Sequence, residues 1–144
     1  MSDTSGLVLL IEPNDDSRAI YSDALRRAGF TVVMAPACAA GLYALAEITP
    51  QIVIASFDPR TRDECLAFCE RLKSNSRTRA IPILLKTETI NGDDLRRATE
   101  ISVLGVSIGP QDGAKITSAV RGVLAVAEGP ASLPQPERKI SRSA

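Results

Sequence analysis

Short runs of apolar residues alternate along the chain with longer amphipathic segments. The first run, Leu7–Ile11, reads LVLLI and is apolar throughout, as expected for a strand that is buried on both faces of a parallel sheet. Asn14 and the two aspartates after it provide an N-cap and an acidic first turn for a helix, which ends with two arginines before Gly29. The first predicted unit is therefore a strand followed by a helix.

The same unit recurs four more times. Apolar runs predict further strands at residues 31–35, 51–57, 81–85 and 103–108, and helical spacing of apolar residues predicts helices at 37–48, near 65–72, near 95–101 and from 116 to about 127. Five consecutive units of this length require right-handed crossovers and a parallel sheet covered by helices on both faces. We therefore predict an α/β fold: a doubly wound, five-stranded parallel sheet of the flavodoxin-like type, with strand order 2-1-3-4-5 and five helices.

Length and composition suit one domain with a tail. The chain has 144 residues, of which 44% are hydrophobic, which is enough for one buried core and too little for two. We predict that the domain comprises residues 6–127. Residues 128–144 contain one glycine and three prolines and end in serine, arginine and lysine, so we expect a disordered tail there.

The charge pattern argues against two classes of partner. Basic and acidic residues number 17 each and are interspersed, so there is no extended positive field that would attract nucleic acid or an anionic membrane. No apolar run approaches the roughly 18 residues of a membrane span, and the first residues are polar. We therefore expect a cytoplasmic protein that binds neither nucleic acid nor a membrane.

The candidate functional residues follow the strands. In a doubly wound sheet, ligands bind outside the carboxyl ends of the strands. The residues at those ends are Glu12, Pro13, Ser56, Phe57, Asp58, Thr87, Gly109 and Pro110.

Five stretches in register resemble the CheY-like receiver domain of two-component response regulators. They read VLLIEPNDDSR, AGFTVVMA, PQIVIASFDP, TRAIPILLKT and a final GP, and together they extend over about residues 6–127. In that family, two acidic residues after the first strand and an aspartate at the end of the third hold Mg²⁺, and this aspartate is phosphorylated. A threonine or serine after the fourth strand and a lysine after the fifth contact the phosphoryl group.

At the metal and acceptor positions, the resemblance implies two losses. Glu12 keeps the first acid, but Pro13 replaces the second and offers no side-chain oxygen to a metal. Ser56 takes the position of the phosphorylated aspartate, and its hydroxyl cannot form an acyl phosphate. We therefore expect no metal site and weak or absent Mg²⁺ binding.

The phosphoryl contacts are changed as well. Thr87 keeps the switch hydroxyl, whereas Gly109 replaces the lysine. Pro110 matches the family's proline, whose preceding peptide bond is typically cis, and Gly109 leaves the cis form open at this position. Attack by a carboxylate on a phosphodonor needs positive charge to neutralise the oxygens, and most of that charge is missing here.

The resemblance to a degenerate receiver, or pseudo-receiver, implies signalling without phosphorylation. We expect no catalytic residues, enzymatic activity or cofactor, and a stand-alone module in a bacterial two-component or phosphorelay pathway. The partner would be a histidine kinase, a response regulator or a second copy of the chain, bound through the face formed by the fourth helix, fifth strand and fifth helix.

Two alternatives stay open. Asp58, at the start of the loop after the third strand, is a displaced candidate phosphoacceptor in a residual acidic pocket with Glu12, although it lies before Pro59 and beyond the strand end. Asp58 can also be interpreted as a turn or cap residue that introduces the loop. The second alternative is a flavodoxin-like domain that binds a small molecule in the space left by the replaced residues.

Overall fold

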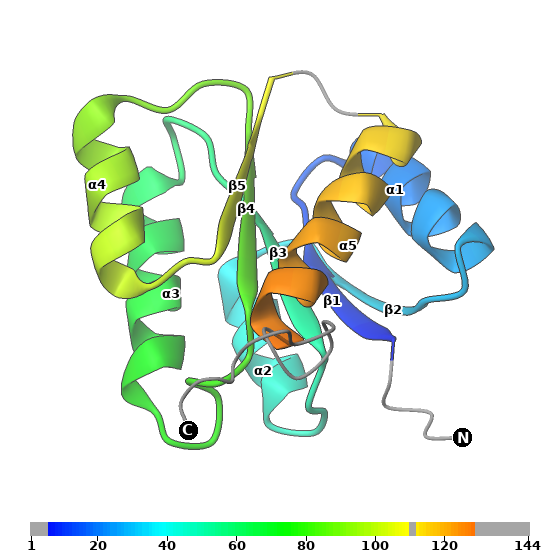
Figure 1. Cartoon of the computed structure of the whole chain (residues 1–144), viewed down its shortest axis with the longest axis horizontal. Coiled ribbons are helices and arrows are strands. Elements are labelled where there is room, and N and C mark those ends of the chain that lie inside the picture. The colour runs from blue at the N-terminus through cyan, green and yellow to red at the C-terminus, as the bar shows by residue number, and fades with distance from the viewer. Residues whose placement is uncertain (1–5, 110–111, 129–144) are drawn as a thin grey trace, which may run out of the picture.

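The computed structural model describes residues 6–109 and 112–128 (Figure 1). The strands are β1 (Leu7–Ile11), β2 (Thr31–Ala35), β3 (Ile52–Ser56), β4 (Ile83–Thr87) and β5 (Gly105–Ile108). The helices are α1 (Asp15–Arg27), α2 (Cys38–Leu45), α3 (Arg62–Ser74), α4 (Gly92–Ile101) and α5 (Gly113–Glu128). All neighbouring strands pair in parallel, in the order β2-β1-β3-β4-β5. The predicted doubly wound fold is confirmed.

The sheet separates two hydrophobic cores. On one face, α1 and α5 pack together over alternate residues of the central strands, including Leu10, Ile54 and Leu84. On the other face, α2, α3 and α4 cover the intervening residues of the same strands, such as Leu9, Val53 and Leu85. Since both faces are covered, β1 and β3 are buried almost throughout, which explains their unbroken apolar sequences.

The turn from β1 into α1 is fixed by local polar contacts. The Asn14 side chain accepts a hydrogen bond from the Ser17 amide at 2.8 Å and so caps α1, as the sequence predicted. Arg18 reaches back from the helix and donates to the carbonyl oxygen of Glu12 at 2.7 Å. These contacts hold the backbone after β1 in one position, and with it the side chain of Glu12.

The fourth strand lies two residues later than predicted. The sequence placed it at 81–85, whereas β4 is Ile83–Thr87. Pro82 has no amide hydrogen for the sheet, so the strand begins after it. At the other end, Lys86 and Thr87 still pair with the neighbouring strands: the Lys86 carbonyl accepts from the Phe57 amide at 2.8 Å and the Thr87 carbonyl from the Gly109 amide at 2.9 Å. The prediction was wrong because it followed apolar residues only.

Other boundaries differ at the ends of elements. The second helix ends at Leu45 instead of residue 48, and the third strand is one residue shorter than predicted at each end. The last strand begins at Gly105 instead of residue 103, after Ser102 ends α4 in a left-handed conformation with φ of 74°. Helix α5 includes Glu128, the first residue of the predicted tail, whereas residues 129–144 and Pro110, where the cis form was left open, lie outside the described residues. No helix in the described part of the chain is long and apolar enough to cross a membrane.

Candidate functional site

Three polar side chains converge at the carboxyl ends of the central strands. Side chains alternate between the faces of a strand, so Glu12 lies on the same face as Leu10 and Ser56 on the same face as Ile54. Lys86 shares that face with Leu84 and is paired in register with Ser56. The sheet therefore directs all three side chains toward the layer formed by α1 and α5.

The carboxylate of Glu12 is surrounded by donors. Its Oε1 accepts a hydrogen bond from the Ser56 hydroxyl and lies 3.1 Å from the ammonium Nζ of Lys86. Its Oε2 accepts from the backbone amide of Asn14 at 3.0 Å. The Glu12 side chain is only 5% exposed, so these three groups replace water as its hydrogen-bond partners.

Lys86 provides a nearly enclosed positive charge. Its side chain is 15% exposed, and its Nζ lies 3.4 Å from the hydroxyl oxygen and 5.1 Å from the ring centroid of Tyr21 in α1. Burial, the largest influence, favours the neutral amine. The hydrogen bond and the charge of Glu12, with a smaller contribution from Tyr21, outweigh it and raise the pKa of Lys86 above its usual value. Lys86 is therefore a charged member of the site.

The sequence prediction did not include Lys86. Ending the fourth strand at Leu85 placed this lysine in a loop, with no defined direction for its side chain. Two signals could have identified it: it lies two residues after Leu84, on the same strand face, and it is a lone charge next to the apolar run IPILL. With the strand bounds corrected, it is the residue of β4 that reaches Glu12.

Thr87 lies on the opposite face of β4 from Lys86. Its hydroxyl donates to the carbonyl oxygen of Thr89 at 2.6 Å, and its side chain is buried. The predicted switch hydroxyl thus lines the same end of the sheet, but its hydrogen bond goes to the loop that leads into α4. Thr87 does not take part in the Glu12, Ser56 and Lys86 cluster.

Two substituted family positions have backbone roles. Pro13 is exposed and offers only its carbonyl oxygen, which lies 3.5 Å from an Arg18 guanidinium nitrogen. Gly109 has φ of +99°, a conformation that side-chain-bearing residues rarely adopt, and an added Cβ would lie 3.5 Å from Lys115 Nζ. A lysine at position 109 would therefore be strained in this backbone.

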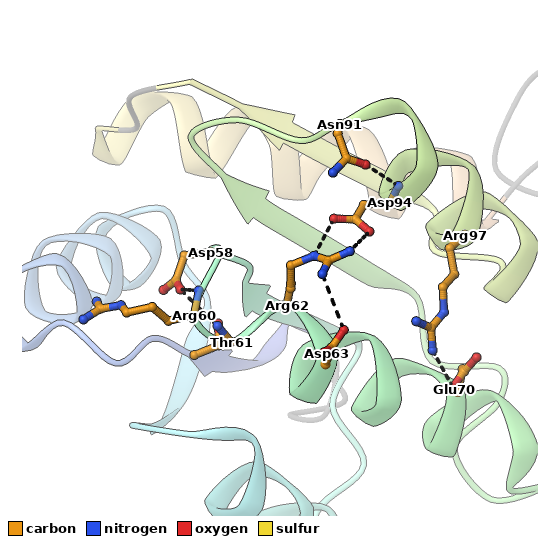
Figure 2. A network of polar contacts seen from close by, with 9 residues as sticks. All are labelled: Asp58, Arg60, Thr61, Arg62, Asp63, Glu70, Asn91, Asp94 and Arg97. Carbon is orange, nitrogen blue, oxygen red and sulfur yellow. Dashed lines mark hydrogen bonds and ion pairs between the residues drawn. The ribbon is translucent and has the colours of Figure 1, made fainter.

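Asp58 caps the loop between β3 and α3. Its Oδ1 accepts hydrogen bonds from the amides of Arg60 at 2.8 Å and Thr61 at 3.1 Å. These are the contacts of an aspartate that introduces a turn. Figure 2 shows its carboxylate directed at these backbone amides. Both contacts are made by Oδ1, so they assign Asp58 a structural role in the loop.

These residues surround an open hollow of about 370 Å³, lined by Glu12, Asn14, Ser17, Ser56, Phe57, Asp58, Pro59, Lys86, Thr87, Glu88 and Thr89. Mg²⁺ requires about six oxygen ligands in regular octahedral geometry. Here Pro13 offers no side-chain oxygen, Asp58 is engaged by two amides, and an ammonium group already contacts Glu12. Within residues 6–109 and 112–128, no three His, Cys, Asp or Glu side chains form a group that could hold a metal ion. The residues present do not fit Mg²⁺.

A second ion pair lies beside the hollow and joins two helices. Arg62, at the start of α3, donates from Nε to Asp94 Oδ2 at 2.9 Å and from Nη2 to Oδ1 at 2.8 Å, which gives a two-pronged contact with the first turn of α4 (Figure 2). The Asp94 amide in turn donates to the side chain of Asn91. Hydrogen bonding to Arg62, with the charges of Arg62 and Arg97, outweighs burial and lowers the pKa of Asp94 below its usual 3.8. Further along both helices, Arg97 pairs with Glu70 at 3.2 Å.

Comparison with known proteins identifies the fold. No protein-family model matches the chain, and no curated protein matches it in sequence. Many solved structures match, among them the chemotaxis protein CheY4 of Vibrio cholerae, with a TM-score of 0.74 and 18% identity over 82% of this chain and 98% of that one. The signal receiver domain of a histidine kinase from Syntrophus aciditrophicus matches with a TM-score of 0.72 and 20% identity, over 92% of this chain and 99% of that one. The Mn²⁺-bound response regulator Rcp1 matches with a TM-score of 0.68 and 16% identity, over 90% of this chain and 99% of that one. The predicted resemblance to receiver domains is confirmed for the fold.

Proposed function

We propose that this chain is a receiver-like signalling domain that acts by binding a protein partner and not by accepting a phosphoryl group. The observation that carries this proposal is the enclosed cluster of Glu12, Ser56 and Lys86. It occupies the place where the resemblance to receivers implies a metal ion and a phosphorylated aspartate. The Ser56 hydroxyl cannot form an acyl phosphate. Its hydrogen bond to the Glu12 carboxylate does not make a metal centre either.

The distribution of apolar residues supports a protein partner. Leu95 in α4, Leu104 before β5 and Ile108 in β5 are large apolar side chains that remain at least 40% exposed. They belong to α4 and to the segment of β5, which is the edge strand of the sheet. With α5, these elements form the α4–β5–α5 face (Figure 1). Exposed large apolar side chains on such a face support an interaction site. This is the face through which we expect a histidine kinase, a response regulator or a second copy of the chain to bind.

The contacts of α4 favour one binding conformation. The ion pairs Arg62–Asp94 and Glu70–Arg97 both connect α4 to α3. Together with the hydrogen bond from Thr87 to the following loop, they stabilise the position of α4 with no phosphoryl group present. A domain held in this way would present its binding face continuously. The proposal assigns the chain no enzymatic activity and no cofactor, and places it in a two-component or phosphorelay pathway.

The test uses the immobilised full chain and a lysate of its native cell. Ile108→Asp and Leu95→Asp place a charge on the α4–β5–α5 face and should abolish capture of the specific partner. The matched control is Tyr43→Asp, because Tyr43 is also a large exposed side chain, at 83%, but belongs to α2, which packs against β1 and β2 and not against β5. Capture by the unmodified chain should be the same with and without acetyl phosphate and Mg²⁺. Loss of capture in the control alone, or capture that requires acetyl phosphate, would contradict the proposal.

The same reagents test the alternative phosphoacceptor. Intact mass after incubation with acetyl phosphate and Mg²⁺ should be unchanged. A phosphoryl adduct that disappears in Asp58→Asn would establish the displaced acceptor instead. Because Asp58 caps the β3–α3 loop, Asp58→Asn retains an oxygen for the two backbone amides and should remain folded.

A further inference from the structure

The hollow at the carboxyl ends of β1, β3 and β4 holds three acidic side chains and one basic one. Glu12, Asp58 and Glu88 line it, and Lys86 is the basic residue. Lys86 does not reach in from the rim: it arises from the strand itself, in register with Ser56, and is largely enclosed. The sheet therefore fixes the origin of its side chain, and Glu12 and Tyr21 place its ammonium group.

The ammonium group occupies the space where a metal ion would contact Glu12. A divalent ion such as Mg²⁺ binds a carboxylate oxygen at about 2.0–2.1 Å and keeps other cations away from it. Lys86 Nζ lies 3.1 Å from Glu12 Oε1, and the same oxygen accepts from Ser56. A divalent ion on Oε1 would lie close to the ammonium, and two cations repel strongly where water is scarce.

We propose that Lys86 is an internal cation that replaces a divalent metal ion at this site, so that the folded chain excludes such ions and its Glu12 carboxylate is neutralised without one. The ammonium supplies positive charge at all times, whereas a metal ion would bind and dissociate with its concentration. The site would therefore keep one arrangement in the presence and the absence of Mg²⁺.

A chain without the Lys86 charge should interact differently with divalent cations. Glu12, Ser56 and Asp58 all present oxygen atoms to the hollow, and hard divalent cations prefer oxygen ligands. With the ammonium removed, the carboxylate of Glu12 would attract an external cation in its place. Substitution of Lys86 by a neutral residue should thus strengthen divalent-cation binding at this site.

The experiment uses Mn²⁺ as a paramagnetic probe and the full chain labelled with ¹⁵N. In Lys86→Gln, which can still donate a hydrogen bond to Glu12, Mn²⁺ should broaden the amide resonances of residues 12–14 and 56–58. The concentration needed should be about tenfold lower than in the unmodified chain, because one positive charge has been removed next to the ligand. Lys86→Arg keeps the charge and should resemble the unmodified chain. Lys86→Ala serves as a second neutral variant if the glutamine variant does not fold.

Two controls separate this site from the general acidic surface. Lys73→Gln removes another half-buried lysine, one that donates to the carbonyls of Arg79 and Ile81, and should leave broadening at residues 12–14 unchanged. Glu12→Gln combined with Lys86→Gln should abolish the gained binding. The inference is overturned if the unmodified chain binds Mn²⁺ at the site as tightly as Lys86→Gln, or if neither neutral variant gains binding. The protein-binding proposal would still stand on its interface variants.

Discussion

Two ion pairs lie near the same end of the sheet and have different surroundings. Glu12–Lys86 joins the residue after β1 to β4, two strands separated by β3, and its side chains are 5% and 15% exposed. Arg62–Asp94 joins two helices, and its arginine side chain is 42% exposed. In the proposed function, the enclosed pair takes the place of the metal and phosphoryl chemistry that the resemblance to receivers implies, whereas the more open pair holds the helix that carries part of the proposed binding face. The comparison teaches that the same type of contact can serve different proposed roles according to its surroundings.

The largest expected effect is the loss of the Lys86 charge. Lys86→Met would leave the Glu12 carboxylate buried without its cation, and breaking a buried pair in this way typically costs about 3 kcal/mol of unfolding free energy. Urea denaturation followed by circular dichroism would measure it. Lys73→Met, which removes a lysine that donates to the backbone carbonyls of Arg79 and Ile81, should cost less. Equal losses in the two variants would mean that Glu12 and Lys86 are not coupled.

The second expected effect concerns Asp94. Asp94→Ala removes the contact between α3 and α4 and should increase hydrogen exchange at the amides of α4 more than at those of β1, because β1 lies in the central sheet. The change in global stability should be smaller than for Lys86→Met, since Arg62 remains free to be solvated. Uniform loss of protection over the whole sheet would contradict a local role for this pair.

The contribution of Asp94 should depend on pH. Because its pKa is lowered in the folded chain, its contribution to stability is fully present above its usual value of 3.8 and is lost as the pH falls through the folded-state value. The difference in unfolding free energy between the natural chain and Asp94→Asn should therefore be constant near neutral pH and decrease below about pH 4. A difference that grew on acidification would have the wrong sign. Denaturation midpoints over this pH range would measure it.

A smaller effect is expected when both members of the enclosed pair are replaced. Glu12→Leu combined with Lys86→Met removes the carboxylate and the ammonium together, and such replacement of a buried pair by apolar residues is often neutral. We expect stability within about 1 kcal/mol of the natural chain, and thus strong non-additivity with the single variants. Additive losses in the double-mutant cycle would show that each residue acts through other contacts.

The sequence predicted the fold well, because buried parallel strands such as Leu7–Ile11 carry an uninterrupted apolar signal. It also identified Glu12, Ser56 and Thr87 as residues at the carboxyl ends of strands, and the structure places all three there. The prediction missed the partner of Glu12, since Lys86 enters the site only if β4 extends past its last apolar residue. Whether a charged residue continues a strand depends on neighbouring strands and on the carboxylate that receives it, which local periodicity does not contain.

The ion pair between Arg62 and Asp94 could not be predicted from the sequence. The two residues are 32 positions apart, and both lie just before the segments that were predicted to be helical. Each has an ordinary local explanation, Arg62 as an exposed helix residue and Asp94 as an acidic first-turn residue near an N-terminus. Only the packing of α3 beside α4 brings the guanidinium and the carboxylate together. Contacts between elements of this kind follow from the fold and not from any motif.

The most direct test of signalling without phosphorylation is the response to beryllofluoride, which imitates a phosphoryl group on an aspartate, in the presence of Mg²⁺. Amide spectra of the ¹⁵N-labelled full chain should be unchanged at Ser56, Asp58 and Thr87 and over the α4–β5–α5 face, because the site offers no acceptor and Lys86 already neutralises Glu12. A new set of resonances at Asp58 and Thr87, accompanied by shifts across that face, would contradict the account and would establish a phosphorylation-responsive receiver.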